Sequence, residues 1–323
     1  MVATSLVLAA LAVALAWPVP VLLARARWPA RAPATALILW QAVALAGGLS
    51  MLGALVTFGL APFGPDLVSS GISFSAQFQG NDLGRAFGPL QVLALSGALL
   101  LGGHLLLNLL VTVVRAERER RRHAQLVLLL STPLADAPGT RLLDDPAPVA
   151  YCLPGAFTTL TVLSVGLVSM LEEDELSAVV EHERAHADQR HDIVLVLFRA
   201  WKASLPWFPI ARRAQREVGL LVEMLADDRA RRAVEDGVLA RAIALVSAGG
   251  PGLAFHAAAP ARPGVPAAGE GRALVDEARD RILRLGSPPL PPGRTAAVIA
   301  AAVALVIVPT LLLLGPGLGR LLA

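Results

Sequence analysis

Four long apolar segments constrain this chain more than any other feature of its sequence. They run from about Val2 to Ala24, from Ala34 to Leu60, from Phe87 to Val114 and from Thr295 to Leu314. Each has about 20 residues or more, the length that an α-helix needs to cross the hydrocarbon core of a bilayer. Backbone groups in lipid must bond within their own segment, so we expect four transmembrane helices.

The composition agrees with a membrane protein. Hydrophobic residues make up 55% of the chain and charged residues 16%, whereas a soluble domain carries about 25% charge. The pI of about 9.9 is high, but the net charge is only +3 and almost every cation is an arginine beside an apolar segment. This placement fits membrane orientation better than phosphate binding, and we expect no direct nucleic-acid binding.

Arginine placement orients the segments, because short cytoplasmic loops are enriched in lysine and arginine. Arg25, Arg27 and Arg31 follow the first segment, and a stronger basic cluster at residues 115–123 follows the third. Both connections should be cytoplasmic, and the loop of about residues 61–85 should face outward. The chain is thus expected to be a multi-pass protein of the cell membrane. Its regions are three helices (residues 1–115), a cytoplasmic domain (116–293) and a fourth helix with a short tail (294–323).

The cytoplasmic region is long enough for a core of its own. Apolar runs at Leu126–Leu130 and Thr158–Val162, bounded by turn residues, favour strands. From Glu172 onward the pattern is helical, and helices are expected at about residues 212–235 and 272–285. The Gly-, Pro- and Ala-rich stretch 248–271 indicates a flexible loop. The predicted fold class is a mainly α membrane protein with an α+β domain inserted between the third and fourth transmembrane helices.

One of the expected helices carries His182-Glu183-Arg184-Ala185-His186, which fits the pattern H-E-x-x-H. Residues four apart lie on the same helix face, so His182 and His186 can bind one Zn²⁺ and leave positions open. Glu183 can take a proton from a water at the metal and pass it to a leaving amine. Cys152 is the single cysteine, which excludes a thiolate-rich zinc site.

A third metal ligand is expected further along the chain. Metzincins carry histidine at the position that Asp192 occupies here, so that pattern fails. Glu223 is the better candidate, with Asp227 one turn later to hydrogen-bond a ligand histidine. Two weaker alternatives stay open: Glu217 in place of Glu223, and Asp228 in place of Asp227.

Several other polar residues have plainer explanations than catalysis. His191 is a polar neighbour of the site rather than a ligand, since its spacing is wrong. His104, inside the third segment, is expected to bond across packed helices. His123 and His256 are expected to be exposed, and Arg118–Arg122 to anchor the chain at the membrane surface. Cys152 is expected to be buried as a small apolar residue. An arginine of Arg229–Arg232 could stabilise the oxyanion, but nothing in the sequence supports this role.

The motifs His182–His186 and Glu223–Asp227, with the acidic helix start Glu173–Leu176, resemble the gluzincin membrane peptidases. Within that group the arrangement of spans is similar to the M56 family (BlaR1/MecR1-like), with the M48 family (HtpX-like) as nearest relative. The M56 resemblance implies a zinc peptidase domain that cleaves a cytoplasmic repressor, BlaI/MecI-like, or itself. The antibiotic sensors of that family carry a penicillin-binding domain after the fourth span, whereas about nine residues follow Leu314 here, so we expect no direct β-lactam sensing by such a domain.

The sequence therefore predicts a zinc metalloendopeptidase that cleaves a cytoplasmic or membrane-proximal protein, with a transcriptional repressor as the substrate that the M56 resemblance implies. One alternative is an M48-like quality-control protease for membrane proteins. Another is a non-proteolytic membrane transducer with a structural zinc site. Glu183 argues against the last, because a structural site has no use for a base.

Overall fold

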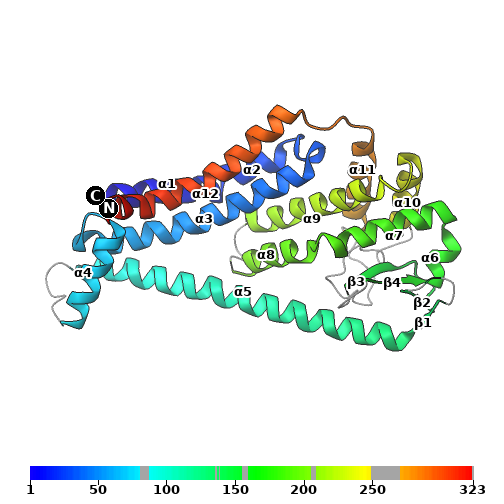
Figure 1. Cartoon of the computed structure of the whole chain (residues 1–323), viewed down its shortest axis with the longest axis horizontal. Helices are drawn as coiled ribbons and strands as arrows, with labels where there is room; N and C mark the ends of the chain where they lie inside the picture. Colours follow the sequence, from blue (N-terminus) through cyan, green and yellow to red (C-terminus); the bar gives the residue numbers. More distant parts are fainter. Residues whose placement is uncertain are drawn as a thin grey trace. The chain divides into compact units, whose positions relative to one another are not determined.

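A computed structural model describes residues 1–80, 87–134, 137, 139–154, 159–204, 209–248 and 270–321 (Figure 1). The chain divides into two compact units. The first, which we call the helical unit, comprises residues 1–109, 201–214 and 290–323. The second, the sheet unit, comprises residues 110–200 and 215–289. Each unit is described by itself.

The helical unit is built from long apolar helices. They are α1 (Val2–Ala16), α2 (Pro18–Arg25), α3 (Pro33–Leu60), α4 (Leu67–Gln79), the first half of α5 (Pro89–Leu130) and α12 (Pro292–Leu321), with 3-10 turns at Pro29–Arg31 and Ala61–Phe63. Four stretches are long and apolar enough to cross a membrane: Val2–Arg25, Pro33–Phe63, Pro89–Leu130 and Pro292–Gly317. They coincide with the four predicted segments to within a few residues, except that α5 extends well beyond the predicted end of the third.

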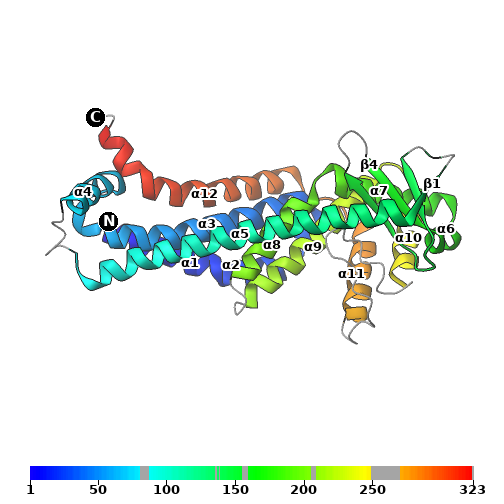
Figure 2. The same ribbon diagram turned by 90° about the horizontal axis from the view of Figure 1, so that it is seen from below.

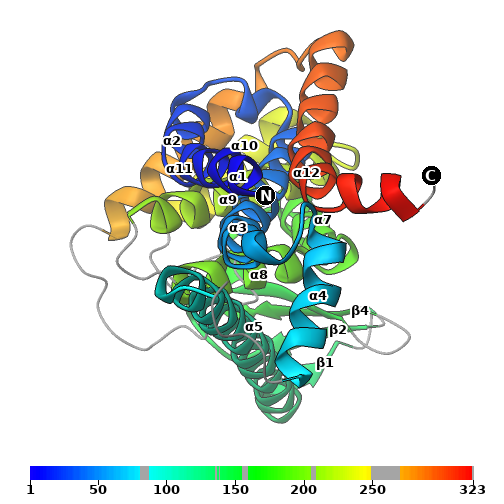
Figure 3. The same cartoon turned by 90° about the vertical axis from the view of Figure 1, so that its left-hand side faces the viewer.

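Helix α3 packs between α1 and α12 at small residues, and the three helices lie side by side when seen end-on (Figure 3). A Cβ atom on Gly53 of α3 would lie 3.0 Å from Leu313 of α12 and 3.2 Å from Leu8 of α1. Glycine therefore allows this close approach, which is typical of packing between membrane helices. On the outer faces large side chains stay exposed, among them Leu6 and Leu99 at 66% and 77%. So much exposed apolar surface suggests a membrane protein.

His104 forms a hydrogen bond between helices within the helical unit. Its Nε2 lies 3.1 Å from the carbonyl oxygen of Ser204, the last residue of α8 (His191–Ser204). The final carbonyls of a helix have no donor within the helix, and His104 can donate to this one when its Nε2 carries the proton. This contact agrees with the bond between packed helices that the sequence favoured for His104.

The sheet unit contains a four-stranded mixed sheet in the order β1-β2-β4-β3. Its strands are β1 (Ser131–Pro133), β2 (Thr140–Leu143), β3 (Ala150–Pro154) and β4 (Thr159–Ser164). β2 and β4 run parallel, while β1 pairs antiparallel with β2 and β3 with β4. The strands are seen from below in Figure 2. Cys152 on β3 is 3% exposed, as expected for a buried apolar residue, and its Sγ lies 3.4 Å from the Thr161 hydroxyl.

Helix α7 (Glu173–Asp188) packs against β3 and β4. The other helices are α6 (Val165–Met170), α8, α9 (Pro209–Ala230), α10 (Asp236–Ala248) and α11 (Glu270–Leu285). One core cluster joins β4 to α6, α7, α10 and α11, through residues that include Leu163, Leu167, Val179, Ile243 and Leu285. This core fixes α7, the helix of the H-E-x-x-H motif, between the sheet and the remaining helices.

The predicted strand at Leu126–Leu130 is wrong, because these residues form the last turns of α5. Val127 is 4% exposed and packs on Leu153 and Val162, whereas Leu129 is 81% exposed. A strand would bury alternate side chains, and here one residue of five is buried. No proline interrupts the helix between Pro89 and Pro133, so α5 continues past the basic cluster until the sheet begins.

The other predicted elements agree more closely with the structure. The run at residues 158–162 falls largely in β4, residue 158 lying outside the described residues, while β1, β2 and β3 were not predicted. The helices expected at residues 212–235 and 272–285 are α9 and α11, with shifted ends. Most of the predicted flexible loop, with His256, lies outside the described residues. The segment of residues 61–85, predicted as an outward-facing loop, contains a helix, α4, and the Asp66 carboxylate caps this helix by accepting a hydrogen bond from the Ser69 amide.

Candidate metal centre

The candidate site begins with the way helix α7 is held. Glu172 precedes the helix and forms a capping box with Glu175, which satisfies amide groups that a helix start leaves unpaired. Ala178 and Val179 are buried in the core. One turn later, His182 and Glu183 are each only 1% exposed. The helix therefore turns the polar residues of its motif inward.

Helix α9 brings the third residue of the site, Glu223. Val218 and Val222 on this helix are fully buried, so its inner face carries the Glu223 carboxylate into the core at 1% exposure. His182, His186 and Glu223 each offer one ligand atom, and these atoms lie within 4.8 Å of one another. The three residues that the sequence proposed as ligands are thus brought together by the fold.

The spacing of these atoms fits a small cation. The His182 Nε2 atom lies 3.2 Å from His186 Nε2 and 3.2 Å from Glu223 Oε2, and His186 Nε2 lies 3.5 Å from Glu223 Oε1. Zinc bound tetrahedrally with bonds of about 2.0–2.1 Å separates its ligand atoms by about 3.3–3.4 Å. Unprotonated imidazole nitrogens and a carboxylate so close together repel one another unless a metal ion or a proton lies between them.

Asp227 and Arg281 orient the first histidine. The Nδ1 of His182 lies 3.0 Å from Asp227 Oδ1, close enough for the carboxylate to hold a proton on this nitrogen and leave Nε2 free for a metal. The guanidinium of Arg281, on α11, donates to both Asp227 oxygens at 2.6 and 2.8 Å and lies 3.3 Å from Glu223 Oε2. All of these groups are at most 4% exposed. Two buried carboxylates therefore share one buried arginine.

This network shifts the pKa values of its members. Burial alone would lower the pKa of His182, but its hydrogen bonds to Asp227 and Glu223 outweigh burial and raise the pKa to about 9. Burial would raise the pKa of Asp227, yet Arg281 and His182 lower it to about 2. Burial would also raise the pKa of Glu223, yet His186, His182 and Arg281 hold it well below its usual range. The metal-free site thus retains a proton at His182 between two ionised carboxylates.

Glu183 differs from the other carboxylates. Burial raises its pKa to about 8, and its Oε1 has no hydrogen-bond partner among the residues that the structure describes. Buried polar atoms without partners are rare in folded proteins and need an explanation. A carboxylate held beside the first ligand and left unpaired can bond to a water, which is the chemistry that the sequence assigned to Glu183.

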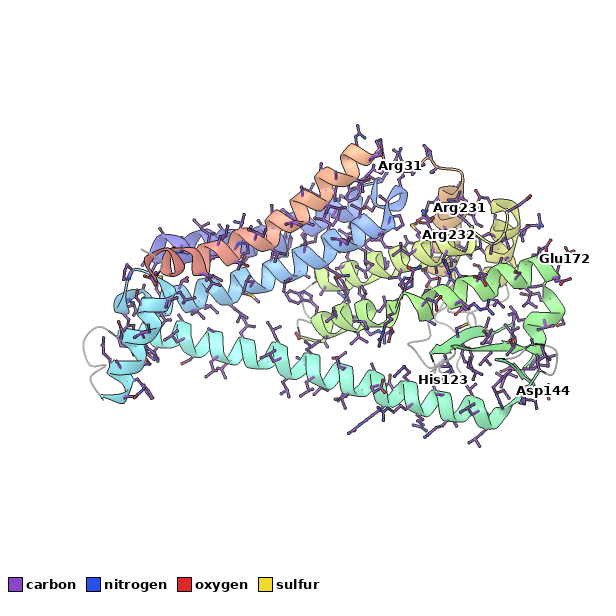
Figure 4. The ribbon with its side chains drawn as sticks, in the orientation of Figure 1. Arg31, His123, Asp144, Glu172, Arg231 and Arg232 are labelled. Carbon is purple, nitrogen blue, oxygen red and sulfur yellow. The ribbon has the colours of Figure 1, made fainter. Side chains whose placement is uncertain are left out.

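The alternatives that the sequence left open lie elsewhere. Glu217 is not part of the ligand group found among the described residues. Asp228 is 34% exposed and pairs with Arg284 and Arg231 instead of a ligand histidine. Arg231, labelled in Figure 4 just beyond α9, donates to both oxygens of Asp236 at 2.6 and 2.7 Å.

Sequence reasoning missed Arg281. A signal was present: Arg281 follows Ala278 by three residues and precedes Leu285 by four, so it shares the apolar face of α11. An arginine on a face predicted to be buried needs a carboxylate partner. The sequence also placed His123 at the surface, whereas its ring lies 5.0 Å from that of Tyr151 and it is half-buried.

Comparison with known proteins supports a peptidase. The model of Peptidase family M48 matches residues 116–235, a stretch that contains α7 and α9 with His182, His186, Glu223 and Asp227. No curated protein and no solved structure matches the chain. The match, together with the His/His/Glu group and the apolar helices, indicates a membrane-associated metallopeptidase.

Proposed function

We propose that this chain is a multi-pass membrane zinc metalloendopeptidase of the gluzincin type, similar to the M56 family. The observation that carries the proposal is the triangle of His182, His186 and Glu223 ligand atoms, with the Glu183 Oε1 beside it, which has no hydrogen-bond partner among the described residues. Two histidines, one glutamate and an open position are the ligand set of catalytic zinc sites. A structural zinc site has four protein ligands and no use for a neighbouring base.

Each residue has a defined task in peptide hydrolysis. His182, His186 and Glu223 would hold zinc, which when bound supplies a Lewis acid for a water and for the substrate carbonyl. Glu183 accepts the proton of the attacking water and donates it to the leaving amine. Asp227 keeps the Nδ1 proton on His182 and is itself held by Arg281. Burial keeps bulk water away from these groups and strengthens their interactions.

The proposed setting is the cell membrane, with residues 116–293 as a cytoplasmic peptidase domain between three transmembrane helices and a fourth. Support comes from the four apolar helices and from the arginine clusters that follow the first and third. The proposed substrate is a cytoplasmic or membrane-proximal protein, with a BlaI/MecI-like transcriptional repressor first. A quality-control role of the M48 type is the second candidate, because the matching family model is that of M48.

The test joins metal content to cleavage in purified full-length protein. About one zinc per chain is expected in the wild type, and its loss in His186→Ala and in Glu223→Ala. Glu183→Gln should keep the zinc and lose about 10²- to 10⁴-fold in cleavage of an unfolded protein substrate, the usual size of a general-base contribution. Glu181→Gln is the matched control, since Glu181 pairs with Arg184 on the same helix. Zinc retained after Glu223→Ala, or full cleavage by Glu183→Gln, would refute the proposal.

A further inference from the structure

His191 stands directly behind the second candidate ligand. It is the first residue of α8, and it is 3% exposed although it sits at a turn between two helices. Its Nδ1 lies 3.0 Å from the Nδ1 of His186, and its Nε2 lies 3.0 Å from the side-chain oxygen of Gln189. The two rings are nearly perpendicular, at 85°, with centroids 5.0 Å apart. Both ring nitrogens of His191 are therefore engaged.

Metal binding at His186 Nε2 would determine where the protons lie along this chain of contacts. His186 turns its Nε2 toward His182 and Glu223, so this nitrogen must be unprotonated to bind a metal. Its proton is then on Nδ1, and His191 must accept it with an unprotonated Nδ1. The proton of His191 consequently resides on Nε2 and is donated to Gln189. The opposite tautomer of His191 would place two N–H groups face to face.

The turn between α7 and α8 creates this contact. In an unbroken helix of 3.6 residues per turn, a residue five positions after His186 would point about 140° away from it. Here α7 ends at Asp188, and Arg190 takes a left-handed backbone conformation with φ of 49°. A residue other than glycine pays roughly 1 kcal/mol for this conformation, and such strain concentrates at functional sites. The turn brings the His191 ring back onto His186.

We propose that His191 is a positioning residue that fixes the tautomer and ring orientation of His186 as a metal ligand, with Gln189 fixing the tautomer of His191 in turn. The inference rests on the proposed function, because it presumes that His186 binds metal. It makes the two ligand histidines unequal. His182 is oriented by a carboxylate, Asp227, and His186 by a neutral imidazole.

Metal affinity, measured by competition against a zinc chelator in the full-length protein, tests the proposal independently of cleavage. His191→Leu removes the acceptor and should weaken zinc binding about 10- to 100-fold, the usual effect of losing such a partner. His191→Asn offers an amide oxygen as acceptor and should recover most of that loss. His123→Phe changes a half-buried histidine elsewhere in the sheet unit and should leave affinity unchanged.

Gln189 supplies a second test that does not disturb the core, because this side chain is exposed. Gln189→Leu should weaken zinc binding a few-fold, whereas Gln189→Glu should strengthen it, since a carboxylate partner raises the basicity of the histidine chain behind the metal. A role in packing alone would not give opposite signs. The Co²⁺-substituted proteins should show matching shifts of their visible absorption bands.

The outcomes separate this inference from the proposed function. If the wild type binds no zinc, both fail. If the wild type binds zinc but His191→Leu binds it equally well, or if the Asn variant is no better than the Leu variant and both Gln189 variants behave alike, the positioning role is overturned and the metallopeptidase proposal stands.

Discussion

The helical unit and the sheet unit place their polar and apolar side chains in opposite ways. In the helical unit, large leucines point outward, such as Leu99 at 77% and Leu100 at 72% exposure. In the sheet unit, ionisable groups point inward: His182, Glu223 and Asp227 are each at most 1% exposed. A soluble domain would avoid both arrangements, since it exposes charges and buries leucines.

The difference teaches what each unit needs from its surroundings. Exposed leucines cost nothing in lipid, so the helical unit relies on a bilayer to cover them. Buried charges cost several kcal/mol each unless they are paired, so the sheet unit must supply a partner for every one. Arg281 provides it for Glu223 and Asp227. Glu183 is the exception, and it is the group that the proposed chemistry requires to be free.

The largest effect is expected from Arg281→Met, which tests the buried ion pairs of the sheet unit. The change removes the guanidinium that Glu223 and Asp227 share and leaves them with protonated His182, and removing one partner of a buried ion pair costs about 3–5 kcal/mol. We expect this loss in the unfolding free energy of the metal-free protein in detergent, measured by thermal melting. Arg279→Met, on the exposed side of the same helix, should change stability little. Equal melting of the two variants would contradict the network.

The exposed leucines can be tested within one helix, α5. Leu99→Arg places a charge in the proposed third span and should cost about 2.5–3.5 kcal/mol in membrane insertion. Leu129→Arg changes a residue that is exposed to the same degree, 81%, but lies beyond the basic cluster, and it should insert normally. Insertion is measured by the membrane-integrated fraction in a translation assay. If both variants insert alike, this part of α5 does not span the bilayer.

Asp227→Asn tests whether the residue that orients His182 must be charged. The amide can still accept the His182 Nδ1 proton, but the negative charge that raises the basicity of the ligand is lost. Zinc affinity should fall about 10- to 100-fold, measured by chelator competition. Asp228→Asn changes the adjacent residue, which faces Arg284 and Arg231, and serves as control. A larger effect at Asp228 would reverse the assignment of the orienting carboxylate.

Among these effects, the change in metal affinity over a single pH unit should be the smallest. The pKa of metal-free His182 is about 9, so below that pH a metal must displace a proton. Metal affinity should therefore rise about tenfold for each pH unit and level off near pH 9, because a ligand histidine binds only when deprotonated. Calorimetry in buffers of different ionisation enthalpy would count the released proton. A flat profile between pH 6 and 8 would show that His182 is already neutral.

Much of the helical unit could be predicted because its signal is local. A transmembrane helix satisfies its own backbone groups, so length and hydropathy are enough to find it. The prediction of secondary structure from the sequence failed where contacts with another segment decide the structure. Leu126–Leu130 has the composition of a strand, yet it is the end of α5, since only Val127 faces the sheet. The three missed strands have only three to five residues each, too few to show a clear period of two, and β2 also pairs with β4 about 20 residues further on.

The sequence by itself determined the pieces of the candidate site that one helix carries. The spacing of His182 and His186 is set by the 3.6-residue turn, and so is that of Glu223 and Asp227. Only the tertiary structure decided which groups meet. Arg281 reaches Asp227 across 54 residues of chain, and His191 reaches His186 because the backbone turns at Arg190. Contacts within a helix follow from its period, whereas contacts between helices depend on packing that no single segment contains.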